Sequence, residues 1–96
     1  MELKCCICGT EFVGYGNNAE PIRKGVCCDR CNALFVITSR IIKAKNPSYE
    51  IIKTEEQRNK IEQQLLDKGF RLIKTIPHNK VYENVENEEN VVLCIL

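Results

Sequence analysis

The sequence predicts a small α+β protein in two parts, one over residues 1–47 and the other over residues 48–96. Six of the seven cysteines lie between Cys5 and Cys31. Beyond them, one segment with helical spacing of apolar residues stands among segments typical of strands. We therefore expect a turn, a hairpin and a helix in the first part. In the second part we expect a β-α-β-β-β order, with a small antiparallel sheet and one covering helix. The two parts are expected to pack as one compact domain.

Two Cys-x-x-Cys pairs dominate the first part. They are Cys5/Cys8 and Cys28/Cys31, separated by a loop of roughly twenty residues, which is typical of zinc sites. Four thiolates make a closed tetrahedral site without an open coordination position, so we expect one structural Zn²⁺. The core of so short a chain is marginal, and zinc binding on the order of 10–16 kcal/mol would couple directly to folding.

Cys6 and Cys27 adjoin the two pairs, and the sequence leaves their role open. One interpretation makes them spare thiols or packing residues, because a free cysteine behaves as a small apolar side chain. The other makes them alternative ligands, through a change of register or a second metal bound between chains.

The segment between and after the pairs predicts a hairpin and a helix. We expect a strand over residues 10–13, a turn over 14–18 and a partner strand over 20–23. Helical spacing then predicts a helix that ends before Asn46-Pro47, with the second cysteine pair in its first turn. Its expected apolar face consists of Leu34, Ile37, Ile41 and Ile42. This order of knuckle, hairpin and helix resembles the treble-clef zinc finger over about residues 5–44.

Residues 4–42 also resemble a group of short phage and prophage proteins. The shared sequence motifs are Cys-Cys-x-Cys-Gly, Gly-Tyr-Gly-Asn-Asn and Cys-Cys-Asp-x-Cys-Asn. An apolar stretch follows them, and then an Ala/Ser-Arg pair, which is Ser39-Arg40 in this chain. The chain departs from that pattern at Ala19, where a proline often follows the Asn-Asn pair. The resemblance implies a mobile-element origin more than an activity.

The second part has a clear helix signal. Thr54 with Gln57 three residues on forms a capping box, and Gly69 ends the helix after about Lys68. The expected strands are 49–53, 70–76, 81–85 and 91–96. The last is apolar on both faces. It either lies in the centre of the sheet or forms an edge that pairs with another chain, giving a homodimer through the C-terminal strand.

Charge and composition limit the classes of partner and the cellular location that we expect. The net charge is +1, so we expect no global attraction to nucleic acid or membrane. The start lacks the pattern of a signal peptide and no apolar run is long enough to span a bilayer. Reduced cysteines fit a cytoplasmic protein, in the cytosol of the host cell.

The first functional hypothesis is a non-enzymatic module that binds and modulates a host protein. The phage resemblance implies such a role, for example inhibition of a CRISPR nuclease or another defence component. An acidic patch would be the contact surface, because acidic groups can mimic phosphates at basic grooves. Its residues are Glu83, Glu86, Glu88 and Glu89. A solvated turn is the simpler interpretation of this charge run.

The alternative is a DNA- or RNA-binding zinc finger. A basic set gathers around the cysteines and along the expected helix, with Tyr15 available for stacking. It consists of Arg23, Lys24, Arg30, Arg40, Lys43 and Lys45. We do not expect an enzyme: the single histidine, His78, lies in an expected turn far from the cysteines, and no base adjoins a candidate nucleophile.

Overall fold

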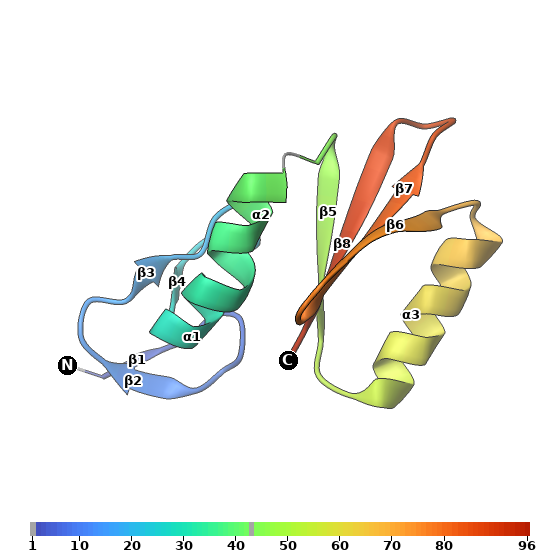
Figure 1. Ribbon diagram of the computed structural model, residues 1–96. Helices are drawn as coiled ribbons and strands as arrows, with labels where there is room; N and C mark the ends of the chain where they lie inside the picture. Colours follow the sequence, from blue (N-terminus) through green and yellow to red (C-terminus); the bar gives the residue numbers. More distant parts are fainter. Residues whose placement is uncertain (1, 43) are drawn as a thin grey trace. The chain divides into compact units, whose positions relative to one another are not determined.

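The computed structural model describes residues 2–42 and 44–96, with Glu2 described by its backbone only. It confirms a small α+β protein with helices and several sheets (Figure 1). The chain divides into two units, Met1–Lys43 and Ala44–Leu96, called here the first and the second unit. None of the helices formed by the described residues has the length and apolar character of a membrane span.

The first unit holds two short antiparallel ladders, in which β1 pairs with β2 and β3 with β4. Their bounds are β1 Glu2–Lys4, β2 Glu11–Val13, β3 Asn17–Asn18 and β4 Val26–Cys27. The expected pairing of residues 10–13 with 20–23 is wrong. Residues 20–23 instead close a turn, in which the N–H groups of Ile22 and Arg23 donate to the Ala19 carbonyl. The chain just before the first cysteine pair folds back and supplies the partner of β2.

The helix expected after the second cysteine pair is present as one helical run. It comprises α1 (Asp29–Cys31), a π-helical turn η1 (Asn32–Val36) and α2 (Ile37–Ile42). The Ile37 N–H donates to the Asn32 carbonyl five residues earlier, which is the π-type bond.

The expected apolar face of this helix is only partly correct, because Leu34 and Ile42 are half-buried but Ile37 and Ile41 are exposed. Ile37 is 46% exposed and Ile41 is 71% exposed, whereas Phe35 is fully buried. The reason is the cysteine that the helix carries. Cys31 points inward, and Phe35 and Ser39 follow at four-residue intervals on the same helix face. The stripe through Ile37 and Ile41 lies beside that face and remains outside.

The second unit has the predicted β-α-β-β-β order. Its elements are β5 Pro47–Ile52, α3 Glu55–Asp67, β6 Arg71–Ile76, β7 Asn79–Asn84 and β8 Glu89–Ile95. The four strands lie in the order β5-β8-β7-β6. The expectation of an antiparallel sheet is wrong in one respect, because β5 and β8 are parallel. A helical crossover starts the next strand in the direction of the previous one, so β6 runs like β5. Two hairpins then return β8 to that same direction.

The last strand is central. β8 pairs with β5 on one side and with β7 on the other, as its apolar character on both faces suggests. Both of its edges are therefore occupied within the chain. A homodimer that pairs through this strand, the alternative expectation, does not fit this sheet order.

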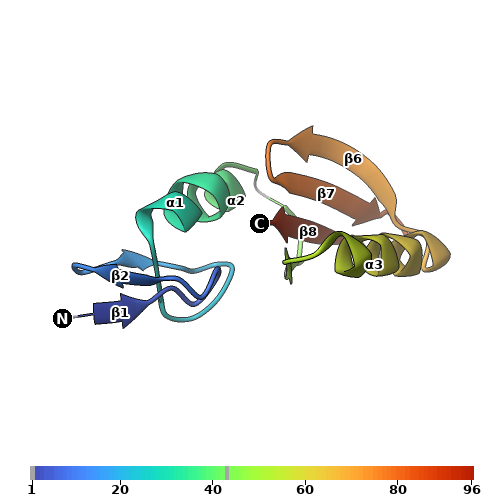
Figure 2. The same cartoon turned by 90° about the horizontal axis from the view of Figure 1, so that it is seen from below.

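α3 covers one face of the sheet, as Figure 2 shows from below. The core between them consists of Ile52, Leu65, Phe70, Tyr82 and Leu93. The Gln57 N–H donates to the Thr54 hydroxyl at 3.2 Å, which confirms the N-cap. The Gln57 side chain accepts from the Lys53 N–H rather than from Thr54, one residue earlier than a standard capping box. Gly69 follows the helix with φ +89°, as a C-terminal stop requires.

A buried asparagine joins three segments of the second unit. The Asn90 side chain accepts from the Lys45 N–H at 2.7 Å and donates to the Tyr82 carbonyl at 3.4 Å. The Asn90 N–H also donates to the Lys45 carbonyl at 3.1 Å. Asn90 thus holds the start of β5 against β8 and β7.

We expect Asn90→Ala to lower the free energy of unfolding by about 1–3 kcal/mol, because it leaves buried backbone groups without their partner. Urea denaturation followed by circular dichroism measures the change. Asn59→Ala on the exposed side of α3 is the matched control, with an expected change within about 0.5 kcal/mol. Equal effects of the two substitutions would contradict the role given to Asn90.

Candidate metal centre

The structure brings Cys5, Cys8, Cys28 and Cys31 together. Their Sγ atoms all lie within 4.8 Å of one another, and those of Cys8 and Cys28 are 3.8 Å apart. Cys5 follows β1, and Cys8 lies in the turn before β2. Cys28 occupies the N-cap position of the helical run, and Cys31 ends its first turn. Two segments twenty residues apart in sequence thus converge on one point.

The geometry suits a tetrahedral metal ion. With metal–sulfur bonds of about 2.3 Å, the sulfur atoms of a tetrahedron are about 3.8 Å apart. The Cys8–Cys28 separation has that value, and the 4.8 Å limit leaves only a small contraction for the others. A set of four sulfur ligands is typical of zinc or iron–sulfur chemistry. The four cysteines can therefore hold a metal ion, and their geometry is consistent with zinc.

The turn that carries the first pair is shaped by its backbone. The N–H groups of Ile7 and Cys8 each lie 3.4 Å from the Cys5 sulfur, to which they donate. The Gly9 N–H donates to the Cys5 carbonyl at 2.9 Å, and Gly9 has φ +80°, a conformation that favours glycine. The Cys5 N–H in turn donates to the Thr10 carbonyl. These bonds direct the Cys5 and Cys8 side chains to the same side of the turn.

The surroundings shift the pKa values of the four thiols in different directions. Burial raises the pKa of Cys5, but hydrogen bonds from the backbone of Cys8, Cys28 and Ile7 outweigh it and lower the value to about 6. Burial raises the pKa of Cys28 and, more strongly, that of Cys31. Burial also raises the pKa of Cys8, but hydrogen bonds from the side chain and backbone of Thr10 outweigh it and lower the value. Without a cation, the cluster therefore favours thiolates in the first cysteine pair and protonated thiols in the second. A metal ion supplies the positive charge that allows all four to ionise.

Cys6 and Cys27, which adjoin the two pairs in sequence, lie outside this cluster. Among the residues that the structure describes, neither Cys6 nor Cys27 belongs to the group of sulfurs. Cys27 is fully buried in β4, and burial followed by the neighbouring thiols raises its pKa to about 11. Burial also raises the pKa of Cys6, whose backbone N–H donates to the Val26 carbonyl. In this arrangement Cys27 is a packing residue and Cys6 fixes the turn through its backbone.

One residue that holds the second pair was not recognised as such from the sequence. Asn17 donates to the Asp29 carboxylate at 2.9 Å and to the Cys27 carbonyl at 3.3 Å. It thereby links β3 to the start of the helical run on both sides of Cys28. The Asn-Asn pair after two glycines indicated only a turn, because the partner of a side-chain amide is not encoded locally.

Two arginines of the predicted basic set are engaged inside the first unit. Arg23 donates to the Cys6 carbonyl at 3.0 Å, and Arg40 donates twice to the Glu20 carbonyl. Both guanidinium groups thus serve the first unit internally. Lys24 and Arg30 are exposed, and Lys45 belongs to the second unit. Lys43 lies outside the described residues.

The acidic residues line different hollows of the second unit. Glu83 and Glu86 line a hollow of about 300 Å³ with Lys68 and Arg71, and Glu83 faces Arg71 in the β6–β7 register. Glu89 lines a separate groove beside α3. Glu88 is exposed in the β7–β8 turn, where its φ is +53°. Cations accompany the carboxylates in both hollows, so neither hollow is purely acidic.

His78 lies in the two-residue turn between β6 and β7, as expected. Its Nδ1 is 3.0 Å from the Ile95 carbonyl, and the Ile95 N–H donates to the His78 carbonyl at 2.8 Å. The histidine therefore connects the hairpin to β8.

Comparison of the chain with protein-family models, with curated proteins and with solved structures finds no match. The four cysteines and the groups around them therefore carry the functional assignment.

We expect Cys8→Ser to abolish stoichiometric zinc binding, because a hydroxyl is a poor substitute for a thiolate ligand. The first unit should then lose a stabilisation on the order of 10 kcal/mol that metal binding supplies. Native mass spectrometry counts the bound ion and thermal unfolding reports the stability. Cys6→Ser, in the same turn, is the matched control and should retain one zinc ion. Full stoichiometry in the Cys8 variant would exclude this ligand set.

Zinc affinity should fall as the pH falls. Cys28 and Cys31, whose pKa values are raised by burial, carry protons at neutral pH that the metal must displace. We expect the dissociation constant to rise at least about hundredfold per pH unit below neutrality, because the protons on Cys28 and Cys31 contribute a factor of about ten each. Below a pH of about 6, where Cys5 also takes up a proton, the dependence should steepen. Competition with a chromophoric chelator of known protonation behaviour measures it, and a flat profile would argue against a thiolate site.

Proposed function

We propose that the four cysteines hold one structural Zn²⁺ in a treble-clef-like arrangement. The observation that carries this proposal is the convergence of four sulfur atoms within 4.8 Å. The order along the chain supports it: the turn with Cys5 and Cys8 comes first, the β3–β4 ladder follows, and the helical run carries the second pair. Zinc prefers such closed sites of four thiolates when its role is structural.

The same site chemistry supports a non-enzymatic role. When four thiolates coordinate one zinc ion, no position is left for a water molecule or a substrate. His78, the residue with the most suitable proton-transfer chemistry, connects its own hairpin to β8 through the Ile95 carbonyl. We therefore propose a binding module, whose first unit is kept folded by the metal.

The partner that we propose is a protein of the host cell, in a cytosol whose reducing conditions preserve thiolate ligands. Large apolar side chains are exposed on the first unit, notably Ile41 at 71% and Val13 at 78%. Exposed apolar groups that lie together are typical of protein-interaction surfaces. Ile37 and Ile41 are four residues apart on one helix and so belong to one stripe. The phage resemblance of residues 4–42 agrees with a host protein as the target.

Nucleic acid is the second candidate, on one specific observation. Tyr15 is 99% exposed and lines a hollow of about 480 Å³ together with Arg30 and Cys28. An exposed aromatic ring beside a guanidinium group is suited to stacking on an unpaired base. Against it, two arginines of the basic set already bind backbone carbonyls of the protein.

The tagged, zinc-loaded chain, incubated with host lysate with and without nuclease, separates the two candidates. We expect a defined protein that survives nuclease treatment and whose capture falls about tenfold with Ile37→Ser/Ile41→Ser, the loss of two hot-spot side chains. Leu66→Ser, which alters a comparably exposed side chain of the second unit, is the control.

Two other results would contradict this proposal. Recovery that vanishes with nuclease, and with Tyr15→Ala, would favour the nucleic-acid candidate. Equal capture by the zinc-free chain would show that the metal-folded unit is not the one that binds.

A further inference from the structure

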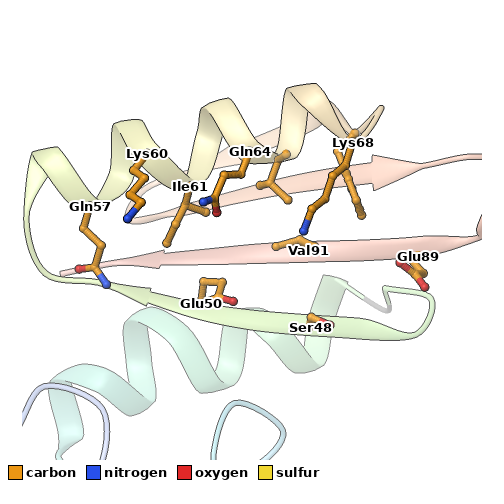
Figure 3. Close-up of a pocket in the computed structure, with 11 residues that line it drawn as sticks. Ser48, Glu50, Gln57, Lys60, Ile61, Gln64, Lys68, Glu89 and Val91 are labelled. Atoms are coloured by element: carbon orange, nitrogen blue, oxygen red, sulfur yellow. The ribbon is translucent and has the colours of Figure 1, made fainter.

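A groove of about 570 Å³ lies between α3 and the strands β5 and β8, entirely within the second unit (Figure 3). Lys60, Gln64 and Lys68 line it from the helix, and Ser48, Glu50 and Glu89 line it from the strands. Its floor includes Ile61 and Val91, which are only partly buried and so leave apolar surface accessible. The groove therefore combines an apolar floor with two polar walls.

The two walls carry opposite charges. The helix wall presents the ammonium groups of Lys60 and Lys68, and the strand wall presents the carboxylates of Glu50 and Glu89. In residues 2–42 and 44–96, the ion pairs join Glu62 to Arg58 and to Lys80, and the four groove charges take no part in them. The groove thus holds cations and anions on facing walls without mutual neutralisation.

The spacing of these charges is matched on the two walls. Lys60 on α3 and Lys68 at its C-cap are eight residues apart, which corresponds to about 12 Å along the helix axis. Asn90 pairs with Pro47, so Glu89 lies level with residue 46, four residues from Glu50 along the strand direction. Four residues of extended chain span about 13 Å. A ligand with charges repeated every four extended residues meets both walls in register.

Hydrogen bonds attach α3 to neighbouring strands at both ends of the groove. The Gln57 side chain joins α3 to the end of β5, accepting from the Lys53 N–H and donating to the Ile51 carbonyl. At the other end, the Asn84 side chain donates to the Lys68 carbonyl at 3.2 Å. A site whose walls are fixed in advance binds at a lower entropic cost.

We propose that this groove binds an extended segment of a partner protein with an acid–base pair that recurs four residues later. Adjacent side chains of an extended chain point to opposite sides, so each acidic residue faces α3 and the next, basic residue faces β5 and β8. This proposal rests on the role as a protein-binding module and names a surface for it on the second unit. Glu89, one of the acidic residues predicted to bind protein, has a place in it.

The charges favour a peptide over the other occupants. A nucleic-acid backbone would bring phosphates against Glu50 and Glu89, which like-charge repulsion disfavours. A small zwitterion is too short to reach charges about 12 Å apart along α3. An extended peptide supplies both signs at the required spacing.

The test uses the full, zinc-loaded, ¹⁵N-labelled chain and two pools of hexapeptides with equal net charge. The first pool has Glu at positions one and five and Lys at positions two and six, with mixed residues between. The second has Glu at positions one and two and Lys at positions five and six. We expect the first pool to shift the amide resonances of Lys60, Gln64, Glu50 and Glu89 saturably, with at least tenfold higher affinity than the second.

Charge reversal supplies the decisive comparison. Lys60→Glu/Lys68→Glu should weaken binding of the first pool at least tenfold. The chain with both reversals should also bind a third pool, with Lys at all four charged positions, more tightly than the wild-type chain does. Lys74→Glu, the same change on β6 outside the groove, should leave both affinities unchanged. Thermal unfolding of each variant verifies that the second unit remains folded.

Equal affinity for the first two pools, no binding of either, or insensitivity to the reversal would each overturn the proposal. Binding of a single-stranded oligonucleotide that the reversal abolishes would replace it by a nucleic-acid site. The proposed function is judged separately. If wild-type and charge-reversed chains capture the same host protein equally, the groove is excluded while the binding role stands. If the wild-type chain captures none, the binding role fails, and the peptide titration alone decides the groove.

Discussion

The first unit depends on one convergence, that of four sulfur atoms from two segments twenty residues apart. Few large apolar side chains are fully buried in this unit, chiefly Ile7, Phe35 and Val36. Thiols packed against one another are weak partners, and burial opposes the ionisation of Cys28 and Cys31. A divalent cation makes the convergence of the four sulfur atoms favourable, because it binds them as thiolate ligands. The turn around Gly9, the Asn17 contacts and the direction of the helical run all serve to bring these atoms together.

The second unit is stabilised in another way. A helix packed on a four-stranded sheet buries Ile52, Leu65, Phe70, Tyr82 and Leu93 without the aid of a metal. Two buried asparagines connect its elements by side-chain hydrogen bonds: Asn90 joins β8 to the chain before β5, and Asn84 joins β7 to the end of α3. The groove beside α3 follows from this architecture. Charged side chains of β5 and of the start of β8 line this groove opposite the helix.

Local signals predicted much of this structure. Cysteine spacing identified the four converging residues, and a capping threonine with a following glycine located α3. The expected order of helix and strands along the chain of the second unit also agrees with the structure. What local signals did not reveal was the choice between partners. Residues 10–13 had two possible neighbours, and the pairing with β1 follows from how the first cysteine turn folds back. The parallel contact of β5 with β8 is a property of the whole path of the chain, since it arises from one crossover followed by two hairpins.

The same limit applies to the charged residues. Arg23 and Arg40 looked like part of a cationic surface, but the carbonyls that they bind belong to segments seventeen and twenty residues away. The acidic residues near the β7–β8 turn looked contiguous because they are close in sequence, yet a turn distributes neighbouring side chains to different sides. In the first helical run, the apolar period had two overlapping solutions. The buried Cys31 selects the one that continues through Phe35 and Ser39.

That selection has a consequence for how the molecule meets its surroundings. Because Cys31 lies on the inward side of the helix, Ile37 and Ile41 remain on the outside. If the proposed zinc ion keeps the first unit folded, a zinc-free chain loses the helix that displays them as a stripe. On the proposed function, the supply of the metal in the cell would determine how many copies expose this surface, and the availability of an inorganic nutrient would become an input to recognition.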